Sequence, residues 1–146
     1  MADIERTGTA VWTGDLRSGE GTMSTGSAVV RDVPFTFATR FQQAPGTNPD
    51  ELIAAAHAGC YSMSLGNVLS QKGYEVEGIE TTATVHLTPK EGGGFAITKS
   101  VLEVRGRVPD IQVEVFQELA EEAEAGCPVS NLLRPGLKIE LEAMLA

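Results

Sequence analysis

The residues of this chain best suited to chemistry are its cysteines, Cys60 and Cys127. They are separated by 67 positions, so they form neither a CxxC redox pair nor a multi-cysteine disulfide framework. Cys60 lies among alanine and glycine residues, which leave room for another helix or subunit to approach the sulfur. Cys127 precedes Pro128 at a predicted helix start, where the helix dipole and free N–H groups favour a thiolate. From the residues alone, two inert core cysteines and two reactive thiols both remain open.

The two histidines suggest two further kinds of cysteine site. His57 and Cys60 share one face of a predicted helix, and Cys127 with His86 would complete a Cys₂His₂ set. The spacing matches no zinc signature, so we expect no metal site. A cysteine hydrolase needs a histidine within hydrogen-bond reach of the sulfur, but the surrounding residues match no protease motif. We therefore interpret His57 as a polar helix residue near a surface or an interface.

The first forty residues predict extended structure. Short β-prone stretches between Arg6 and about Thr25 flank a glycine-rich turn at residues 14–21, which indicates a hairpin. Residues 33–37 form a third extended segment, and Pro34 favours an edge or a strand start over a central strand.

The element that carries Cys60 is predicted to be a helix from Leu52 to about Gln71. It follows a turn and an acidic start at residues 48–51 and stops near Gly73. Its small and apolar residues occur around the whole circumference, which is typical of a helix buried on nearly all sides. One layer of sheet in a chain of this length does not readily cover such a helix, so we expect a second subunit to complete a homodimer.

The alternation of apolar and polar residues after this helix predicts three more strands. Residues 79–87 and 95–108 indicate a long hairpin with a turn at 91–94, and residues 137–143 indicate a closing strand.

Two helices are expected between the hairpin and the closing strand. One is amphipathic, with Asp110 as its N-cap and Gly126 as its C-cap, and a short helix then begins at Pro128. Strands grouped before and after helices indicate the α+β class. Because no repeat or linker-like segment interrupts the chain, we expect residues 1–146 to form a single domain.

Composition and charge exclude several classes of partner. The chain has 146 residues, with 20 acidic and 11 basic side chains and a net charge of −9, which argues against nucleic acid and anionic membranes because both need a basic face. No apolar run approaches the roughly 20 residues needed to span a bilayer. The first residues lack the basic start and apolar stretch of a signal peptide. We expect a cytoplasmic protein.

Two motifs carry a resemblance to a known family. The first comprises residues 39–41 and 45–63 and includes the stretch from His57 to Cys60, and the second is residues 127–131. Both resemble motifs of the OsmC/Ohr family of osmotically inducible and organic hydroperoxide resistance proteins, and the element order fits from end to end. The His-Ala-x-Cys form and the position of Arg40 resemble the OsmC branch more than the Ohr branch.

The resemblance implies an OsmC-like fold, with antiparallel sheets around a long buried central helix, in an intertwined homodimer with active sites at the subunit interface. By motif position, Cys60 would be the peroxidatic nucleophile, Cys127 the resolving thiol and Arg40 the catalytic arginine. The family's glutamate aligns with Asp50, so this sequence departs from the usual residue. Since Glu51 is adjacent, Asp50 and Glu51 are both candidates to hold Arg40.

The implied activity is a thiol peroxidase that reduces organic hydroperoxides, and less well hydrogen peroxide, to alcohols. Only a thiolate attacks the O–O bond, and a free thiol with a pKa near 8.5 is only about 3% ionised at pH 7. A guanidinium would stabilise the thiolate and donate hydrogen bonds to the peroxide oxygens, and a carboxylate would fix the guanidinium.

Attack would leave a sulfenic acid on Cys60, which Cys127 condenses to a disulfide in a cycle that requires no metal or organic cofactor. The resemblance implies a thiol reductant, in this family often a dihydrolipoyl protein. Two other functions stay open, namely a non-catalytic binding or interaction protein with two structural cysteines and a different cysteine enzyme such as a hydrolase.

Overall fold

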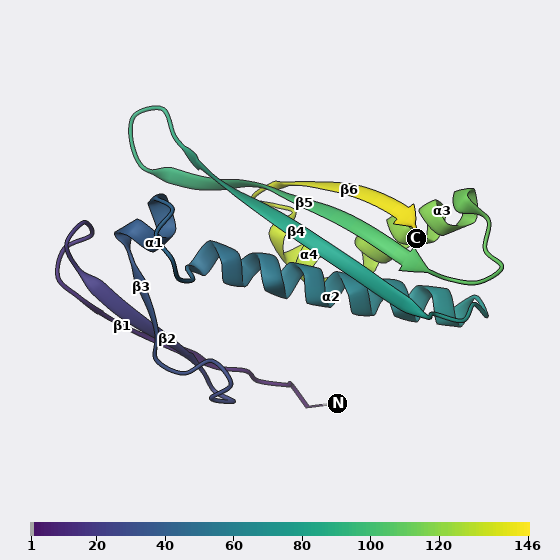
Figure 1. The fold of residues 1–146 in the computed structure, drawn as a ribbon, viewed down its shortest axis with the longest axis horizontal. Helices are drawn as coiled ribbons and strands as arrows, with labels where there is room; N and C mark the ends of the chain where they lie inside the picture. The colour runs from purple at the N-terminus through teal and green to yellow at the C-terminus, as the bar shows by residue number, and fades with distance from the viewer. Residues whose placement is uncertain (1) are drawn as a thin grey trace. The chain divides into compact units, whose positions relative to one another are not determined.

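A computed structural model describes residues 2–146 of the chain. Its residues group into two compact units, one up to Leu52 and one from Ile53 to Ala146. Figure 1 shows the helices and strands of both units, which mix in the α+β manner expected from the sequence. The sequence predicts a single domain over residues 1–146, and this stays a prediction.

The N-terminal unit holds a three-stranded antiparallel sheet in the order β1-β2-β3. The strands are β1 (Gly8–Thr13), β2 (Glu20–Thr25) and β3 (Val33–Thr36). The turn between β1 and β2 is held by the Asp15 carboxylate, which accepts hydrogen bonds from the amides of Arg17 and Ser18, both at 2.9 Å. Pro34 lies on the edge strand β3, where its missing N–H breaks no inner ladder. The predicted hairpin and third strand are confirmed.

Aromatic rings cover one face of this small sheet. Trp12 and Phe35 lie with their ring centroids 5.4 Å apart. Both rings close over Gly21, where an added Cβ would lie only 2.8 Å from each of them. Around this cluster the unit stays open, since Val11 is 66% exposed and Leu16 is 58% exposed.

A short helix, α1 (Phe37–Phe41), follows β3 and was not predicted from the sequence. Its start is a capping box: the Thr36 hydroxyl accepts from the Thr39 amide at 3.3 Å, and the Thr39 hydroxyl accepts from the Thr36 amide at 2.9 Å. This cap fixes the last turn of α1, where Arg40 lies.

The long helix α2 (Pro49–Gln71) confirms the helix expected around Cys60. The side chain of Asn48 starts it by accepting a hydrogen bond from the Glu51 amide at 2.8 Å. Gly73 ends it with φ of +88°, a conformation that glycine adopts without strain.

The C-terminal unit pairs a second sheet, in the order β4-β5-β6, with two helices after the hairpin. The elements are β4 (Gly78–Pro89), β5 (Phe95–Arg107), α3 (Val113–Gly126), α4 (Pro128–Leu133) and β6 (Lys138–Leu145). Figure 1 shows β6 beside β5 and the long hairpin of β4 and β5 running along α2. The predicted hairpin, the helix from Pro128 and the closing strand are confirmed.

One expectation about this sheet is wrong. Both sheets were expected to be antiparallel, but β6 pairs with β5 in parallel, from Lys99 opposite Lys138 to Gly106 opposite Leu145. The reason is that α3 and α4 form a crossover that returns the chain to the start of β5, and a parallel neighbour requires such a connection.

The start of α3 also differs from the prediction. Asp110 has φ of +60° and lies in a turn, whereas an N-cap residue needs extended backbone. The N-cap is Gln112, whose side chain makes no capping hydrogen bond, and the C-cap is Cys127 in place of Gly126.

The core of the C-terminal unit lies between the sheet, α2 and α3. Its fully or nearly buried apolar residues are Tyr61, Leu65, Leu69, Leu102, Val104, Val108, Phe116, Leu119, Ala120, Ala123 and Cys127. Sheet and helix approach closely at Gly106, where an added Cβ would lie 2.7 Å from the Phe116 ring. The Tyr61 hydroxyl donates to the Ala120 carbonyl at 3.0 Å and so ties α2 to α3.

Within the single chain, α2 buries one face only. His57 and Tyr61 face the core, whereas Ala55, Gly59 and Met63 are exposed, Met63 by 78%. Burial on nearly all sides, as the sequence predicts, is therefore incomplete within one chain.

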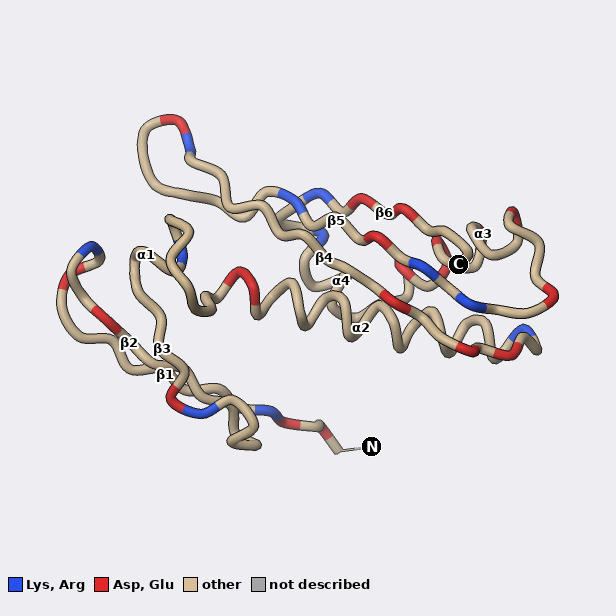
Figure 2. The backbone as a smooth tube through the Cα atoms, viewed as in Figure 1, with Lys and Arg blue, Asp and Glu red and all other residues tan. Residues whose placement is uncertain are grey.

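Charge is distributed very differently over α2 and the sheet (Figure 2). From Leu52 to Gln71 the helix has no charged residue. An uncharged helix of this length could suggest a membrane span, but no helix within residues 2–146 is long and apolar enough to cross a membrane. The outer face of the sheet alternates in sign: Lys138 contacts Glu140 at 3.2 Å and Lys99 contacts it at 3.8 Å.

Candidate active site

The C-terminal unit brings the two cysteines together within one chain. Cys60 lies in the middle of α2, and Cys127 is the N-cap residue of α4. Both are free thiols, and their side chains interact with each other. Cys60 is partly exposed, whereas Cys127 is completely buried. Of the two cysteines, Cys60 is therefore the one with accessible surface.

The surroundings of Cys60 set its ionisation. Burial raises the pKa of the Cys60 thiol, and the neighbouring Cys127 thiol adds to that rise. A hydrogen bond from the backbone amide of Val129, in the first turn of α4, acts in the opposite direction. Burial outweighs the single amide, so the net shift of this pKa is upward.

Arg40 is held by a carboxylate within the N-terminal unit. Its Nε donates to Asp50 Oδ2 at 3.0 Å, and its Nη2 donates to Asp50 Oδ1 at 3.3 Å, so the contact is bidentate. Asp50 is only 8% exposed. Of the two candidate carboxylates, Asp50 is the one that holds the guanidinium. Glu51 is exposed and contributes its backbone amide to the Asn48 side chain.

A cavity of about 270 Å³ lies next to Arg40 in the same unit. Its walls are mostly aromatic and apolar: Trp12, Leu16, Phe35, Thr36, Phe37, Arg40 and Phe41. The guanidinium carbon of Arg40 lies 5.3 Å from the centroid of the Phe41 ring, within cation–π distance. The cavity therefore combines an apolar surface with one fixed positive charge.

The sequence predicts His57 near a surface or an interface, but the structure places it in the core of the C-terminal unit. It is fully buried, with Nδ1 at 2.7 Å from the Ser100 hydroxyl and Nε2 at 2.8 Å from the Ser130 hydroxyl. Burial lowers the pKa of His57, so the ring is neutral at pH 7. Neither serine was identified from the sequence as a partner of His57. One signal was available: Ser100 lies on β5 two residues before the buried Leu102, so the strand alternation places it on the inward face.

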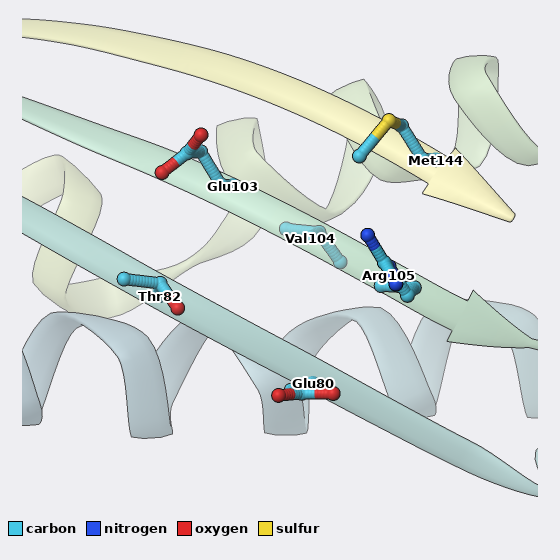
Figure 3. Close-up of a pocket in the computed structure, with 6 residues that line it drawn as sticks. All are labelled: Glu80, Thr82, Glu103, Val104, Arg105 and Met144. Carbon is cyan, nitrogen blue, oxygen red and sulfur yellow. The ribbon is translucent and has the colours of Figure 1, made fainter. Parts of the chain in front are cut away.

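Metal ligands and other hollows were sought in the same structure. Within residues 2–146, no three His, Cys, Asp or Glu side chains lie close enough together to hold a metal ion. A groove of about 300 Å³ lies on the C-terminal sheet (Figure 3), lined by Glu80, Thr82, Glu103, Val104, Arg105 and Met144. It contains carboxylates, a threonine hydroxyl and a guanidinium but no thiol. The cysteine pair therefore stays the candidate reaction centre.

Comparison with known proteins identifies the family of this chain. The family model described as OsmC-like protein matches residues 42–142. The chain belongs to this family. The match includes both cysteines and both candidate carboxylates, and Arg40 lies two residues before it.

Individual relatives lie in both branches of the OsmC-like family. Peroxiredoxin OsmC of Escherichia coli (strain K12) is 44% identical over 139 residues, which cover 95% of this chain and 96% of that protein. Organic hydroperoxide resistance protein OhrB of Bacillus subtilis (strain 168) is 33% identical over 98 residues, covering 66% of this chain and 69% of that protein. The resemblance inferred from the two motifs is confirmed.

The fold is that of the same family. The crystal structure of OhrB from Bacillus subtilis superimposes with a TM-score of 0.75 at 28% identity, covering 94% of this chain and 97% of that one. The α+β, OsmC-like fold expected from the sequence is therefore confirmed.

Proposed function

We propose that this protein is a cysteine-based peroxidase that reduces organic hydroperoxides to alcohols, with Cys60 as the nucleophile and Cys127 as the resolving thiol. The enzyme class follows from the 44% identity to Peroxiredoxin OsmC over 95% of the chain. The observation that carries the assignment of roles is the contact between a partly exposed thiol and a fully buried one in the same chain.

The proposed cycle has three steps. The Cys60 thiolate attacks one peroxide oxygen, the O–O bond breaks, and the leaving alkoxide takes up a proton to become the alcohol. Cys60 is then a sulfenic acid, and the Cys127 thiol attacks its sulfur, releases water and forms a Cys60–Cys127 disulfide. A dithiol reductant, such as a dihydrolipoyl protein, returns both residues to thiols and is itself oxidised to a disulfide.

The roles of Arg40 and Asp50 are assigned from their motif position. In this proposal the Arg40 guanidinium stabilises the thiolate and the departing alkoxide, which offsets the rise in thiol pKa caused by burial. The bidentate contact with Asp50 supports this role, because it fixes the guanidinium plane and leaves its remaining N–H donors free for substrate.

The aromatic cavity supports a preference for organic over hydrogen peroxide. Its walls are apolar apart from Thr36 and Arg40, so an alkyl or aryl group is favoured there while the peroxide oxygens lie toward the charge. Each methylene removed from water contributes about 0.8 kcal/mol to binding. Hydrogen peroxide has no such group and gains none of this binding free energy.

A homodimer is part of the proposal. The exposed face of α2, which includes Ala55, Gly59 and Met63, carries no charge from Leu52 to Gln71. Small side chains and a long apolar one suit the close approach of a second copy, which would complete the burial of this helix.

One experiment tests the function. The reduced protein is treated with one equivalent of cumene hydroperoxide, and free thiols, intact mass and remaining peroxide are measured. We expect both thiols to disappear, the mass to fall by two hydrogens, and one peroxide to be consumed per chain. Hydrogen peroxide should react more slowly. Two persisting thiols at unchanged mass would indicate a binding protein, and ester hydrolysis with intact peroxide would indicate a hydrolase.

A further inference from the structure

A buried hydrogen-bonded bridge connects three elements of the C-terminal unit. The imidazole of His57, on α2, lies between the hydroxyls of Ser100 on β5 and Ser130 on α4, at 2.7 and 2.8 Å. All three side chains are fully buried. A buried polar group is stable only when its partners are present, so such a bridge fixes the relative placement of the elements that it joins.

The bridge runs beside the cysteine pair. His57 precedes Cys60 by three residues, which places both on one side of α2. Ser130 follows Cys127 by three residues and comes directly after Val129, whose amide hydrogen-bonds to the Cys60 sulfur. The same turn of α4 thus presents an amide and a second thiol to Cys60.

Few other contacts hold α4 to α2. The only buried residue of α4 is Ser130. Asn131 of α4 makes two other side-chain hydrogen bonds: its Nδ2 donates to the Ala125 carbonyl of α3 at 3.0 Å, and its Oδ1 accepts from Arg134 at 3.3 Å. Among the hydrogen bonds between side chains of residues 2–146, the one between His57 and Ser130 is the link between α2 and α4.

We propose that His57 is a positioning residue: through Ser130 it holds the first turn of α4 so that the Val129 amide and the Cys127 thiol stay directed at the Cys60 sulfur. The amide would stabilise the attacking thiolate, and the thiol would stay within reach of the sulfenic acid. This role rests on the proposed function only in so far as that function uses the Cys60 thiolate.

The ring is suited to this role in its neutral form. A neutral imidazole has one donor and one acceptor nitrogen, and a serine hydroxyl can satisfy either. The charged groups that act on it oppose each other, since Glu124 of α3 raises the pKa of His57 and Arg134, after α4, lowers it. Burial dominates and keeps the ring neutral, so the bridge persists at the pH where a peroxidase of this kind would work.

The test compares Ser130→Ala with a matched control, Ser64→Ala. Ser64 also ties α2 to another helix, because its hydroxyl donates to the Ala123 carbonyl of α3 at 2.8 Å. The readout is the pH dependence of Cys60 alkylation by iodoacetamide, followed by mass spectrometry of the peptide that contains Cys60. This reagent reports the thiolate and involves no peroxide.

For Ser130→Ala we expect the midpoint of this profile to move upward by about one pH unit and the rate at pH 7 to fall about tenfold, as for the loss of one hydrogen bond to a charged group. The Ser64→Ala profile should coincide with that of the wild type. Coincident profiles for Ser130→Ala and wild type, or equal displacement in both variants, would overturn the proposal.

A second pair of variants separates the two ends of the ring. The amide of His57→Gln reaches the position of Nε2 and can keep the bond to Ser130, whereas that of His57→Asn reaches only the position of Nδ1, next to Ser100. We expect His57→Gln to resemble wild type and His57→Asn to resemble Ser130→Ala. Identical alkylation profiles for His57→Gln and His57→Asn would contradict the proposal. If neither of these variants folds, the comparison of Ser130→Ala with Ser64→Ala decides whether the proposal holds.

The same samples distinguish this proposal from the proposed function. A wild-type protein that consumes no hydroperoxide would refute the peroxidase while its alkylation profile still tested the bridge. Conversely, an active peroxidase whose Ser130→Ala profile is unchanged would refute the bridge alone.

Discussion

The two units of this protein differ in how much core they contain. Among residues 2–146, the buried core of large apolar side chains belongs to the C-terminal unit, where Leu102 and Phe116 are completely inaccessible. In the N-terminal unit the large apolar side chains stay accessible, with Val29 exposed by 88% and Trp12 by 38%. One unit is a packed scaffold, and the other is a sheet whose apolar side chains lack an equivalent cover.

This difference matches the chemistry of each unit. In the proposed function two thiols must meet within bonding distance, which needs rigid elements, and both cysteines lie in the packed unit. Arg40 and its aromatic cavity lie in the open unit, and in the proposal the exposed apolar side chains there receive the substrate or a second subunit. In the proposed function, this core-poor region with a fixed charge serves as a binding surface.

The largest expected effect is at the sulfurs of the packed unit. Cys60→Ser should reduce peroxide consumption to the uncatalysed background, because a hydroxyl of ordinary pKa cannot attack the O–O bond at neutral pH. Cys127→Ser should allow one turnover and then accumulate Cys60 as sulfenic and sulfinic acid, which intact-mass measurement detects. If Cys60→Ser kept the steady-state rate of the wild type, Cys60 would not be the nucleophile, and the reaction centre would not lie at the cysteine pair of this unit.

The next effect tests whether the open unit takes part in catalysis. Arg40→Met should lower the peroxidase rate by about 10²–10³, the usual loss for one charge-assisted donor in a transition state. Arg40→Lys should recover little, because lysine keeps the charge but not the planar fork.

Asp50→Asn should reproduce much of the Arg40 defect, while the matched variant Glu51→Gln should stay within about twofold of wild type, since only Asp50 contacts the guanidinium. Rates and thiol pKa values that are the same in Arg40→Met and wild type would make this unit a passive surface.

A third prediction concerns stability. Phe116→Ala should lower the free energy of unfolding by about 3–5 kcal/mol, because it leaves a cavity against Gly106 in the packed core. Trp12→Ala removes a larger side chain but one that is already 38% exposed, so its effect should be well below that of Phe116→Ala. Urea titration of both variants measures the difference, and equal losses would show that the two units are packed alike.

The smallest expected effect is the pH dependence caused by His57. Its pKa is lowered in the folded state, so the unfolded chain binds the proton more readily. The contribution to stability is complete above about pH 6.5 and declines as the pH falls below that value, by up to about 1.4 kcal/mol per pH unit. Urea titrations between pH 5 and 7 should show this slope in wild type and not in His57→Gln. The control His86→Gln, on the exposed face of β4, should retain it.

Local patterns were sufficient to predict most elements of the fold. Alternation marked the strands, and a proline at the first helical position marked α4. Strand alternation carries no information on the direction of a neighbour, so the parallel pairing of β6 was missed. The five-residue helix α1 was missed as well, because it is set by one capping box and is too short to show a period.

The candidate site likewise has some residues that local sequence motifs identify and others that depend on contacts between distant parts of the sequence. The motifs identified Cys60, Cys127 and Arg40, but the choice between Asp50 and Glu51 depends on where the first turn of α2 begins. One residue rotates a helical side chain by about 100°, which decides whether it faces Arg40. The bridge at His57 was out of reach, since its partners lie 43 and 73 positions away.

The sulfurs that meet in the packed unit are 67 residues apart in sequence, and most of that unit lies between them. A disulfide that closes a loop of this size removes much conformational freedom from the unfolded chain and raises the free energy of unfolding by about 4 kcal/mol. In the proposed cycle, peroxide would therefore leave the protein in its most heat- and protease-resistant form. The reductant would return the protein to its less stable dithiol form. Resistance to proteolysis would then distinguish molecules that have reacted with peroxide from those that have since been reduced.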